Sequence, residues 1–437
     1  MKGSDLMKKM TMVTMILAAM LAASLTGCGT NQSAENTAAH NTSSVSIPAD
    51  SAADSGNAEQ ADAEKTDDIA VVALSQGVSS DAENSDTFTK RDLAQTADTS
   101  DAQYLTVSDG QTIDITAEGV YVISGTAANC TIKVNADENA KVQLVLDGVS
   151  ITNSNFPAIY VVSADKVFVT TTNTENTLTV SGQFTADGET NTDAVIFSKD
   201  DLVLNGTGTL NIVSNSGNGI TSKDDLKITG GTYNVQSALD AIEANDSISI
   251  SDGMFTISTN KDGLHCENDN AEGTVTITGG TFTINAKSDG IQATALLQID
   301  GGNLTITASE GLEATYVLIN DGTINITASD DGINASVKST AYDTVIEING
   351  GDLTVAVGQG DTDAIDSNGS IYVNGGTINI TAQMSSFDYD KTVEFNGGTI
   401  IINGQEVSEI PQSMMGGGMH GGMGGNMQGG FGGRRGF

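Results

Sequence analysis

Residues 279–284 read Gly-Gly-Thr-Phe-Thr-Ile, and variants of this hexapeptide recur along the second half of the chain. Each copy begins with a Gly-Gly or Asp-Gly pair and continues with alternating polar and apolar residues. The second glycines of successive pairs, from Gly231 to Gly398, lie 20 to 29 residues apart. A coil of this length holds three short strands and three turns. The spacing therefore predicts an all-β chain folded as a parallel β-helix of about ten coils, each paired with the next.

The alternation within each copy predicts which side chains point into the core, since successive residues of a strand face opposite ways. One apolar column should point inward, and its aromatic members are therefore interpreted as core rather than as a platform for sugars. This column consists of Tyr233, Phe255, Phe282, Leu304, Ile324, Leu353, Ile378 and Ile400.

The outward positions of the same segments carry hydroxyl and amide side chains, and two interpretations of them stay open. Thr is common in such walls because β-branched residues favour strands. A flat face of hydroxyl groups could also lie along a polysaccharide. The candidate binding face consists of Thr281, Thr283, Asn303, Thr305, Thr323 and Asn325.

A second motif follows the Gly pairs: an acid, Gly or Ala, Ile or Leu, a polar residue and a small residue, as in residues 289–293. Stacked coils bring equivalent residues to ~4.8 Å from one another. Two carboxylates at about 5 Å repel by roughly 1 kcal/mol even in water. Bridging by Ca²⁺, which prefers oxygen ligands, or a simply solvated acidic edge would each relieve this repulsion.

The calcium hypothesis takes its candidate ligands from these motifs and the acids beside them. They are Asp240, Glu243, Asp262, Glu267, Asp289, Glu310, Glu313, Asp330, Asp331, Asp361, Asp363 and Asp366. His265 interrupts the oxygen-only series. A second acidic column in early coils, with Asp201, Asp224 and Asp225, is accompanied by Lys residues and is interpreted as structural turns.

Charge and cysteine content exclude two classes of protein. The 437 residues include 18 Lys plus Arg and 56 Asp plus Glu, for a net charge of −38. Such an anion is not expected to bind nucleic acid, because phosphate binding requires Lys and Arg. Three Cys cannot form a disulfide framework. Cys130 and Cys266 are interpreted as buried small hydrophobes.

The N-terminus has the features of a bacterial lipoprotein signal. Lys8 and Lys9 precede an apolar run, which ends in Leu-Thr-Gly and Cys28. This pattern predicts a signal peptide over 1–27, lipidation of Cys28 and anchoring at the outer face of the cell membrane. We further expect a disordered acidic Ser/Ala/Asp-rich linker over 28–103, the β-helix over 104–405, and a disordered Gly/Met-rich tail over 406–437. The protein is expected to be a monomer.

Several segments of the body resemble a known family. They include Val142-Gln-Leu-Val-Leu-Asp-Gly-Val149 and the segments 119–126, 157–160, 164–167, 174–178, 197–202 and 222–231. In this order they resemble the clostridial carbohydrate-binding β-helix proteins, which are secreted and related in fold to pectate lyases. The resemblance covers about residues 104–404. It implies a right-handed parallel β-helix, bound Ca²⁺, and affinity for plant polysaccharides such as cellulose and pectic acid.

The expected function is therefore calcium-dependent binding of polysaccharide at the cell surface without catalysis. The first alternative is a calcium-dependent lyase similar to pectate lyases, which needs a Lys or Arg base. No Arg lies between Asp92 and Gly433, and Lys261, next to Asp262, is the base to test. Lys261 could instead form a surface ion pair without a catalytic role. The second alternative is an adhesin or spacer without glycan specificity.

Overall fold

The computed structural model describes residues 87–268, 272–360 and 362–411. These residues form 36 strands and no helix. One of the two sheets has twelve strands, so the solenoid has about twelve coils rather than about ten. The earliest coils lack the Gly pair, and the repeat therefore predicted too few coils. Within the described ranges, no helix has the length and hydropathy of a membrane span. The predicted signal peptide, Cys28, Asp361 and the tail from residue 412 lie outside these ranges.

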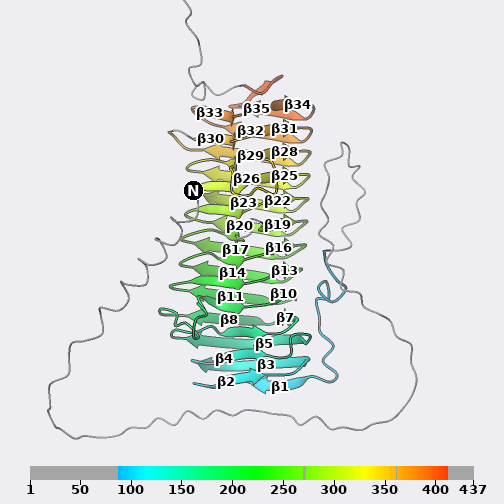
Figure 1. The fold of residues 1–437 in the computed structure, drawn as a ribbon, viewed down its shortest axis with the longest axis vertical. Helices are drawn as coiled ribbons and strands as arrows, with labels where there is room; N and C mark the ends of the chain where they lie inside the picture. Colours follow the sequence, from blue (N-terminus) through cyan, green and yellow to red (C-terminus); the bar gives the residue numbers. More distant parts are fainter. Residues whose placement is uncertain (1–86, 269–271, 361, 412–437) are drawn as a thin grey trace, which may run out of the picture. The chain divides into compact units, whose positions relative to one another are not determined.

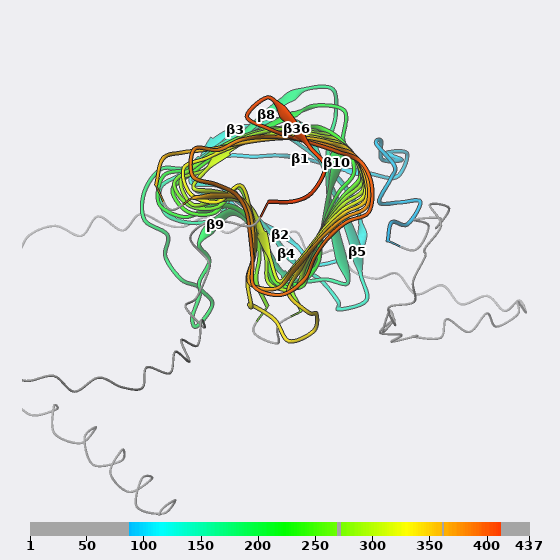
Figure 2. The same cartoon turned by 90° about the horizontal axis from the view of Figure 1, so that it is seen from above.

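Three walls of parallel strands surround one core (Figures 1 and 2). Walls I and II belong to a 24-stranded sheet, and the long strands β3 and β5 extend into both. Wall I consists of β1 (Gln103–Thr106), β3 (Gly119–Ala128), β5 (Lys141–Asn153), β7 (Lys166–Thr171), β10 (Asp201–Gly206), β13 (Leu226–Ile228), β16 (Ser247–Ile250), β19 (Thr274–Ile277), β22 (Leu296–Ile299), β25 (Tyr316–Ile319), β28 (Val345–Ile348), β31 (Ser370–Val373) and β34 (Val393–Phe395).

Wall II carries the hexapeptide repeat. Its strands are β8 (Glu175–Val180), β11 (Thr209–Ser214), β14 (Thr232–Ser237), β17 (Met254–Thr259), β20 (Thr281–Asn285), β23 (Asn303–Ala308), β26 (Thr323–Ala328), β29 (Asp352–Val357), β32 (Thr377–Thr381) and β35 (Thr399–Ile402). The strand β36 (Gln405–Val407) pairs antiparallel with β35 at the C-terminal end of the solenoid.

Wall III is the twelve-stranded sheet and carries the acidic motif. Its strands are β2 (Thr112–Ile115), β4 (Thr131–Asn135), β6 (Ile159–Ser163), β9 (Ala194–Ser198), β12 (Asn218–Ser222), β15 (Ile242–Ala244), β18 (Leu264–Cys266), β21 (Asp289–Ala293), β24 (Glu310–Ala314), β27 (Ile333–Ala335), β30 (Asp363–Ser367) and β33 (Ser385–Tyr389).

The predicted inward column lies in the core. Tyr233, Phe255 and Phe282 are each 1% exposed and occupy equivalent positions in three successive coils. The Phe255 and Phe282 rings stack with centroids 4.4 Å apart, and those of Tyr233 and Phe255 lie 5.3 Å apart. Cys130 and Cys266 are buried and free, as the sequence predicted.

The Gly pairs form the turns that connect wall I to wall II. The second glycine has a positive φ in each copy, for example +98° at Gly280, a conformation that other residues rarely adopt. A Cβ at the first glycine, Gly279, would lie 2.4 Å from the carbonyl oxygen of Ser251 in the preceding coil. The repeat therefore marks places where successive turns approach too closely for a side chain.

Residues 87–95, which the sequence included in the linker, contact the outer face of wall I. The guanidinium of Arg91 lies 4.3 Å from the centroid of the Phe168 ring. The carbonyl oxygen of Asp92 accepts a hydrogen bond from the Asn205 amide at 3.1 Å. Gln95 accepts one from the Gly206 amide at 2.9 Å. This part of the segment is thus held against the solenoid by specific polar contacts.

Candidate functional site

The acidic motif forms two columns of side chains along wall III, outside the core. The first column occupies the corner that enters each strand, where Asp289 pairs in register with Glu310. In the second column, three residues further on, Glu243 pairs with His265, Gln292 with Glu313, and Asn334 with Asp366. From Glu243 to Asp366, neutral or basic residues thus separate the acids of the second column, but Asp366 pairs with Asp388 in the next coil. The first column is instead a nearly continuous series of acids.

Carboxylates of the first column hold the backbone of the following coil. Asp240 accepts a hydrogen bond from the Asp262 amide at 3.1 Å, and Asp262 accepts one from the Asp289 amide at 3.0 Å. Asp331 accepts one from the Asp363 amide at 2.8 Å. These hydrogen bonds satisfy backbone N–H groups at the corners. The acids therefore have a structural role, whether or not they also bind a ligand.

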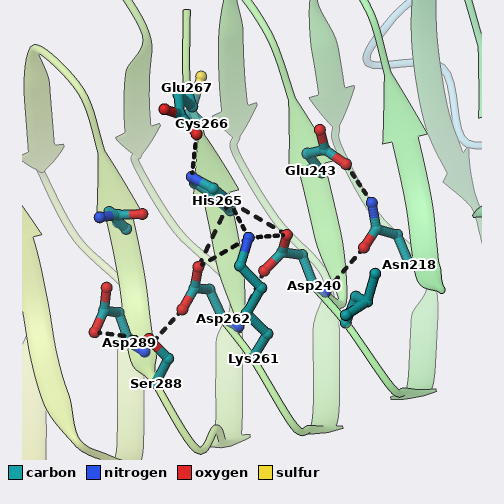
Figure 3. Close-up of polar contacts among 12 residues, drawn as sticks. Asn218, Asp240, Glu243, Lys261, Asp262, His265, Cys266, Glu267, Ser288 and Asp289 are labelled. Atoms are coloured by element: carbon teal, nitrogen blue, oxygen red, sulfur yellow. Dashed lines mark hydrogen bonds and ion pairs between the residues drawn. The ribbon is translucent and has the colours of Figure 1, made fainter. Parts of the chain in front are cut away.

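The coils around Asp240 and Asp262 bring their own cations to the acids (Figure 3). Lys261 Nζ lies 2.8 Å from Asp240 Oδ2 and 3.8 Å from Asp262 Oδ2. His265 Nδ1 lies 3.3 Å and 3.5 Å from the same two oxygens. Its other nitrogen lies 3.4 Å from the exposed carboxylate of Glu267. Basic side chains therefore offset the acids here, and the set is not the all-oxygen site that Ca²⁺ prefers.

The pKa values of this cluster reflect the pairing. Burial opposes ionisation of Asp240, but hydrogen bonds and charge from His265 and Lys261 lower its pKa to about 2. Burial also disfavours the charged form of Lys261, yet the bond to Asp240 raises the pKa of its amine above the ordinary value. A lyase base must lose its proton near neutral pH. The raised pKa of Lys261 gives the lyase alternative no support.

A second cluster consists only of oxygen ligands. Asp289, Glu310 and Glu313 each offer one carboxylate oxygen within 4.8 Å of the others. Burial, followed by the charges of neighbouring acids, raises the pKa of Asp289 to about 7. Burial and, among the acids, chiefly Glu313 raise the pKa of Glu310 to about 7, although a hydrogen bond from Asn334 acts in the opposite direction. These shifts indicate carboxylates whose negative charge is incompletely offset.

The neighbours of this cluster add donors and one buried oxygen. Glu313 forms an ion pair with Lys338 at 2.9 Å and accepts a hydrogen bond from Gln292 at 2.8 Å. The Asn334 amide donates to Glu310 at 2.9 Å, while its own oxygen is buried without a hydrogen-bond partner among the described residues. Three carboxylates and an unsatisfied amide oxygen are a donor set that fits Ca²⁺.

The remaining predicted ligands occupy different surroundings. Glu243 is paired with Lys223 at 2.9 Å. The Glu267 side chain is 70% exposed, and Asp330 is also exposed. Burial and the charges of Asp331, Asp363, Asp388 and Asp390 raise the pKa of Asp366 to about 7. The twelve candidates therefore do not form one uniform ladder.

A third cluster was not among the predicted ligands. Asp201, Asp224 and Asp225 each offer an oxygen within 4.8 Å of the others. Lys166 lies 3.3 Å from Asp201, and Ser247 donates to Asp225 at 2.6 Å. The repeated Lys-Asp-Asp segments at 199–201 and 223–225 were the signal for this cluster. Its ion pair and side-chain bond are compatible with the structural turns inferred from the sequence.

The six residues of the candidate binding face are exposed on three neighbouring strands of wall II, β20, β23 and β26. Thr281, Asn303 and Thr323 form one row in register, and Thr283, Thr305 and Asn325 form the other. This face is polar, and it lies on a different wall from the acidic motif of wall III.

A family model described as carbohydrate-binding domain-containing protein matches residues 109–364. A protein of Acetivibrio thermocellus with the same description is 36% identical over 137 residues, which are 30% of this chain and 47% of that protein. The chain thus spans about half the length of this curated relative. A solved structure of a polysaccharide lyase-like protein from C. thermocellum, a gadolinium derivative, has 32% identity and a TM-score of 0.46, covering 51% of this chain and 96% of that one.

Proposed function

The chain belongs to the family of carbohydrate-binding domain-containing proteins, and from this premise we propose that it binds acidic polysaccharide through Ca²⁺ at Asp289, Glu310 and Glu313. The observation that carries the proposal is the convergence of three carboxylates that, among the described residues, have one paired cation, Lys338. The ion would neutralise these acids. It would also attract the carboxylates of a uronate chain, which an anionic protein repels on its own.

The ligand chemistry supports Ca²⁺ at this cluster rather than at the one around Asp240. Ca²⁺ takes six to eight oxygen ligands, including carboxylates and amide oxygens. Asp289, Glu310, Glu313 and Asn334 would supply part of this set, and glycan oxygens or water would complete it. Asp240 and Asp262 already contact Lys261 and His265, which would compete with a metal ion.

Retention on polygalacturonate tests the proposal. We expect the full chain to bind in the presence of Ca²⁺ and to be released by a chelator. Glu310→Gln should weaken binding by about ten-fold or more, because it removes one charged ligand. Glu138→Gln is the matched control, since Glu138 is an exposed acid in the turn between β4 and β5. Binding that the chelator leaves unchanged would contradict calcium bridging.

The same incubations separate the alternative functions. A lyase would release unsaturated uronate products that absorb ultraviolet light, and Lys261→Ala would abolish them. We expect no such product. Absence of both glycan binding and product would favour the adhesin or spacer.

We also propose that lipidated Cys28 anchors the protein at the outer face of the membrane, on the basis of the signal pattern in residues 8–28. Cells supplied with a radiolabelled fatty acid should incorporate the label into the wild-type protein but not into Cys28→Ser. Equal labelling of both proteins would refute the anchor.

A further inference from the structure

The outer face of wall I differs in character from that of wall II. Where wall II exposes Thr and Asn, strands β22, β25, β28 and β31 of wall I carry partly buried apolar and aromatic side chains. These strands lie in the upper part of the column that is labelled on the right of Figure 1. In the strand register, Leu296 pairs with Tyr316 of the next coil. Glu347 pairs with Leu318 on one side and with Tyr372 on the other. Partly exposed apolar side chains that gather on one strand face make it a candidate interaction surface.

A loop adds a second aromatic ring to this face. Residues 336–344 connect β27 to β28 and belong to the longest of the repeat spacings. The Tyr342 ring centroid lies 5.7 Å from that of Tyr316, with an angle of 57° between the ring planes. Tyr342 is 39% exposed. The insertion thus forms an aromatic corner with one ring on the strand and the other on the loop.

Polar groups border the rings. The Tyr316 hydroxyl donates a hydrogen bond to Glu347, and the Asn374 amide donates to the same carboxylate at 3.4 Å. On the adjacent coil, Gln298 donates to Asp300 at 2.7 Å. Sugar rings have apolar C–H faces and hydroxyl groups around their edge. Amphipathic aromatic rings beside carboxylate and amide groups match both parts.

The charge of this face selects among glycans. Strands β22, β25, β28 and β31 contain no Lys or Arg, whereas Glu347 lies on β28 and Asp300 directly follows β22. Lys338, on the loop that carries Tyr342, is paired with Glu313 of β24. Carboxylates without a nearby cation repel a uronate chain but can accept hydrogen bonds from the hydroxyl groups of a neutral one. We infer that Tyr316, Tyr342, Glu347 and Tyr372, which we name the tyrosine patch, bind neutral polysaccharide independently of Ca²⁺. This site goes beyond the proposed function and lies on a different wall.

Retention of the full chain on amorphous cellulose, galactomannan and β-1,3-glucan in excess chelator tests the inference. We expect binding to at least one of these neutral glycans. Tyr342→Ala and Tyr372→Ala should each weaken it by about ten-fold or more, as expected for aromatic anchors. Tyr104→Ala is the matched control, because Tyr104 is 72% exposed and lies on β1, well before these strands in the solenoid. Melting curves of the variants show whether they remain folded, and Tyr342→Phe should retain most of the binding.

Two results would overturn the inference: no retention on any of the three neutral glycans, or equal retention of wild type and both alanine variants. A dimer that Tyr342→Ala converts to monomer would instead identify the patch as a contact between copies of the chain. Failure of calcium bridging would be detected separately. In that case, the chelator would leave retention of the wild-type protein on polygalacturonate unchanged.

Discussion

Replacement of Phe255 by alanine is expected to lower the free energy of unfolding by about 3–5 kcal/mol, the range for large aromatic residues truncated in a core. Phe255 is 1% exposed and lies between Tyr233 and Phe282, in contact with the ring from the coil on either side. The change removes both stacking contacts and leaves a cavity, which the parallel strands β14 and β20 on its two sides cannot readily close.

Urea denaturation followed by circular dichroism measures this loss. Tyr104→Ala provides the control, since this exposed residue should change stability by less than about 0.5 kcal/mol. A loss below about 1 kcal/mol for Phe255→Ala would show that the aromatic column contributes little beyond its strands, contrary to the packing described above.

Removal of Ca²⁺ is expected to destabilise the protein more at alkaline than at acidic pH. The pKa values of Asp289 and Glu310 are about 7, above the ~4 of unfolded carboxylic acids. The folded state therefore binds these protons more tightly than the unfolded state does. Stability without metal is highest below about pH 4 for these two groups and is lost as the pH rises through about 7. The pKa of Asp366 is also raised to about 7, so this residue gives stability the same pH dependence.

Ca²⁺ that binds only the folded protein should reverse this loss. At a concentration 100-fold above the dissociation constant, it contributes about 2.7 kcal/mol. Melting temperatures in chelator should thus be lower at about pH 8 than at about pH 5.5, and added Ca²⁺ should raise the value at about pH 8 most. Mg²⁺ is the control ion, because it requires a smaller octahedral site. A melting temperature at alkaline pH that responds neither to Ca²⁺ nor to chelator would contradict the metal site.

The acidic motif shows how far the sequence could predict the candidate site. The repeat placed Asp240, Asp262, Asp289 and Glu310 in one column, because equivalent positions of successive coils must stack. It did not separate the coils that carry their own cations from those that do not. Lys261 approaches Asp240, 21 residues earlier in the chain, and Lys338 approaches Glu313, 25 residues earlier. Such contacts depend on turn geometry and side-chain conformation, which a repeat pattern leaves open.

The sequence by itself determined the parallel β-helix and its inward column, because a period of two within each strand and a recurrent Gly turn together permit few folds. Only the tertiary structure decided which surfaces carry chemistry. In the sequence, the loop at 336–344 only lengthens the spacing between two Gly pairs. In the structure, it places Tyr342 beside Tyr316. Nearby cations then distinguish the buried Asp240, which Lys261 and His265 neutralise, from Asp289 and Glu310, whose charge is incompletely offset. The physical reason is that backbone pairing fixes the period of a coil, whereas the field at a carboxylate depends on every charge that folding brings near it.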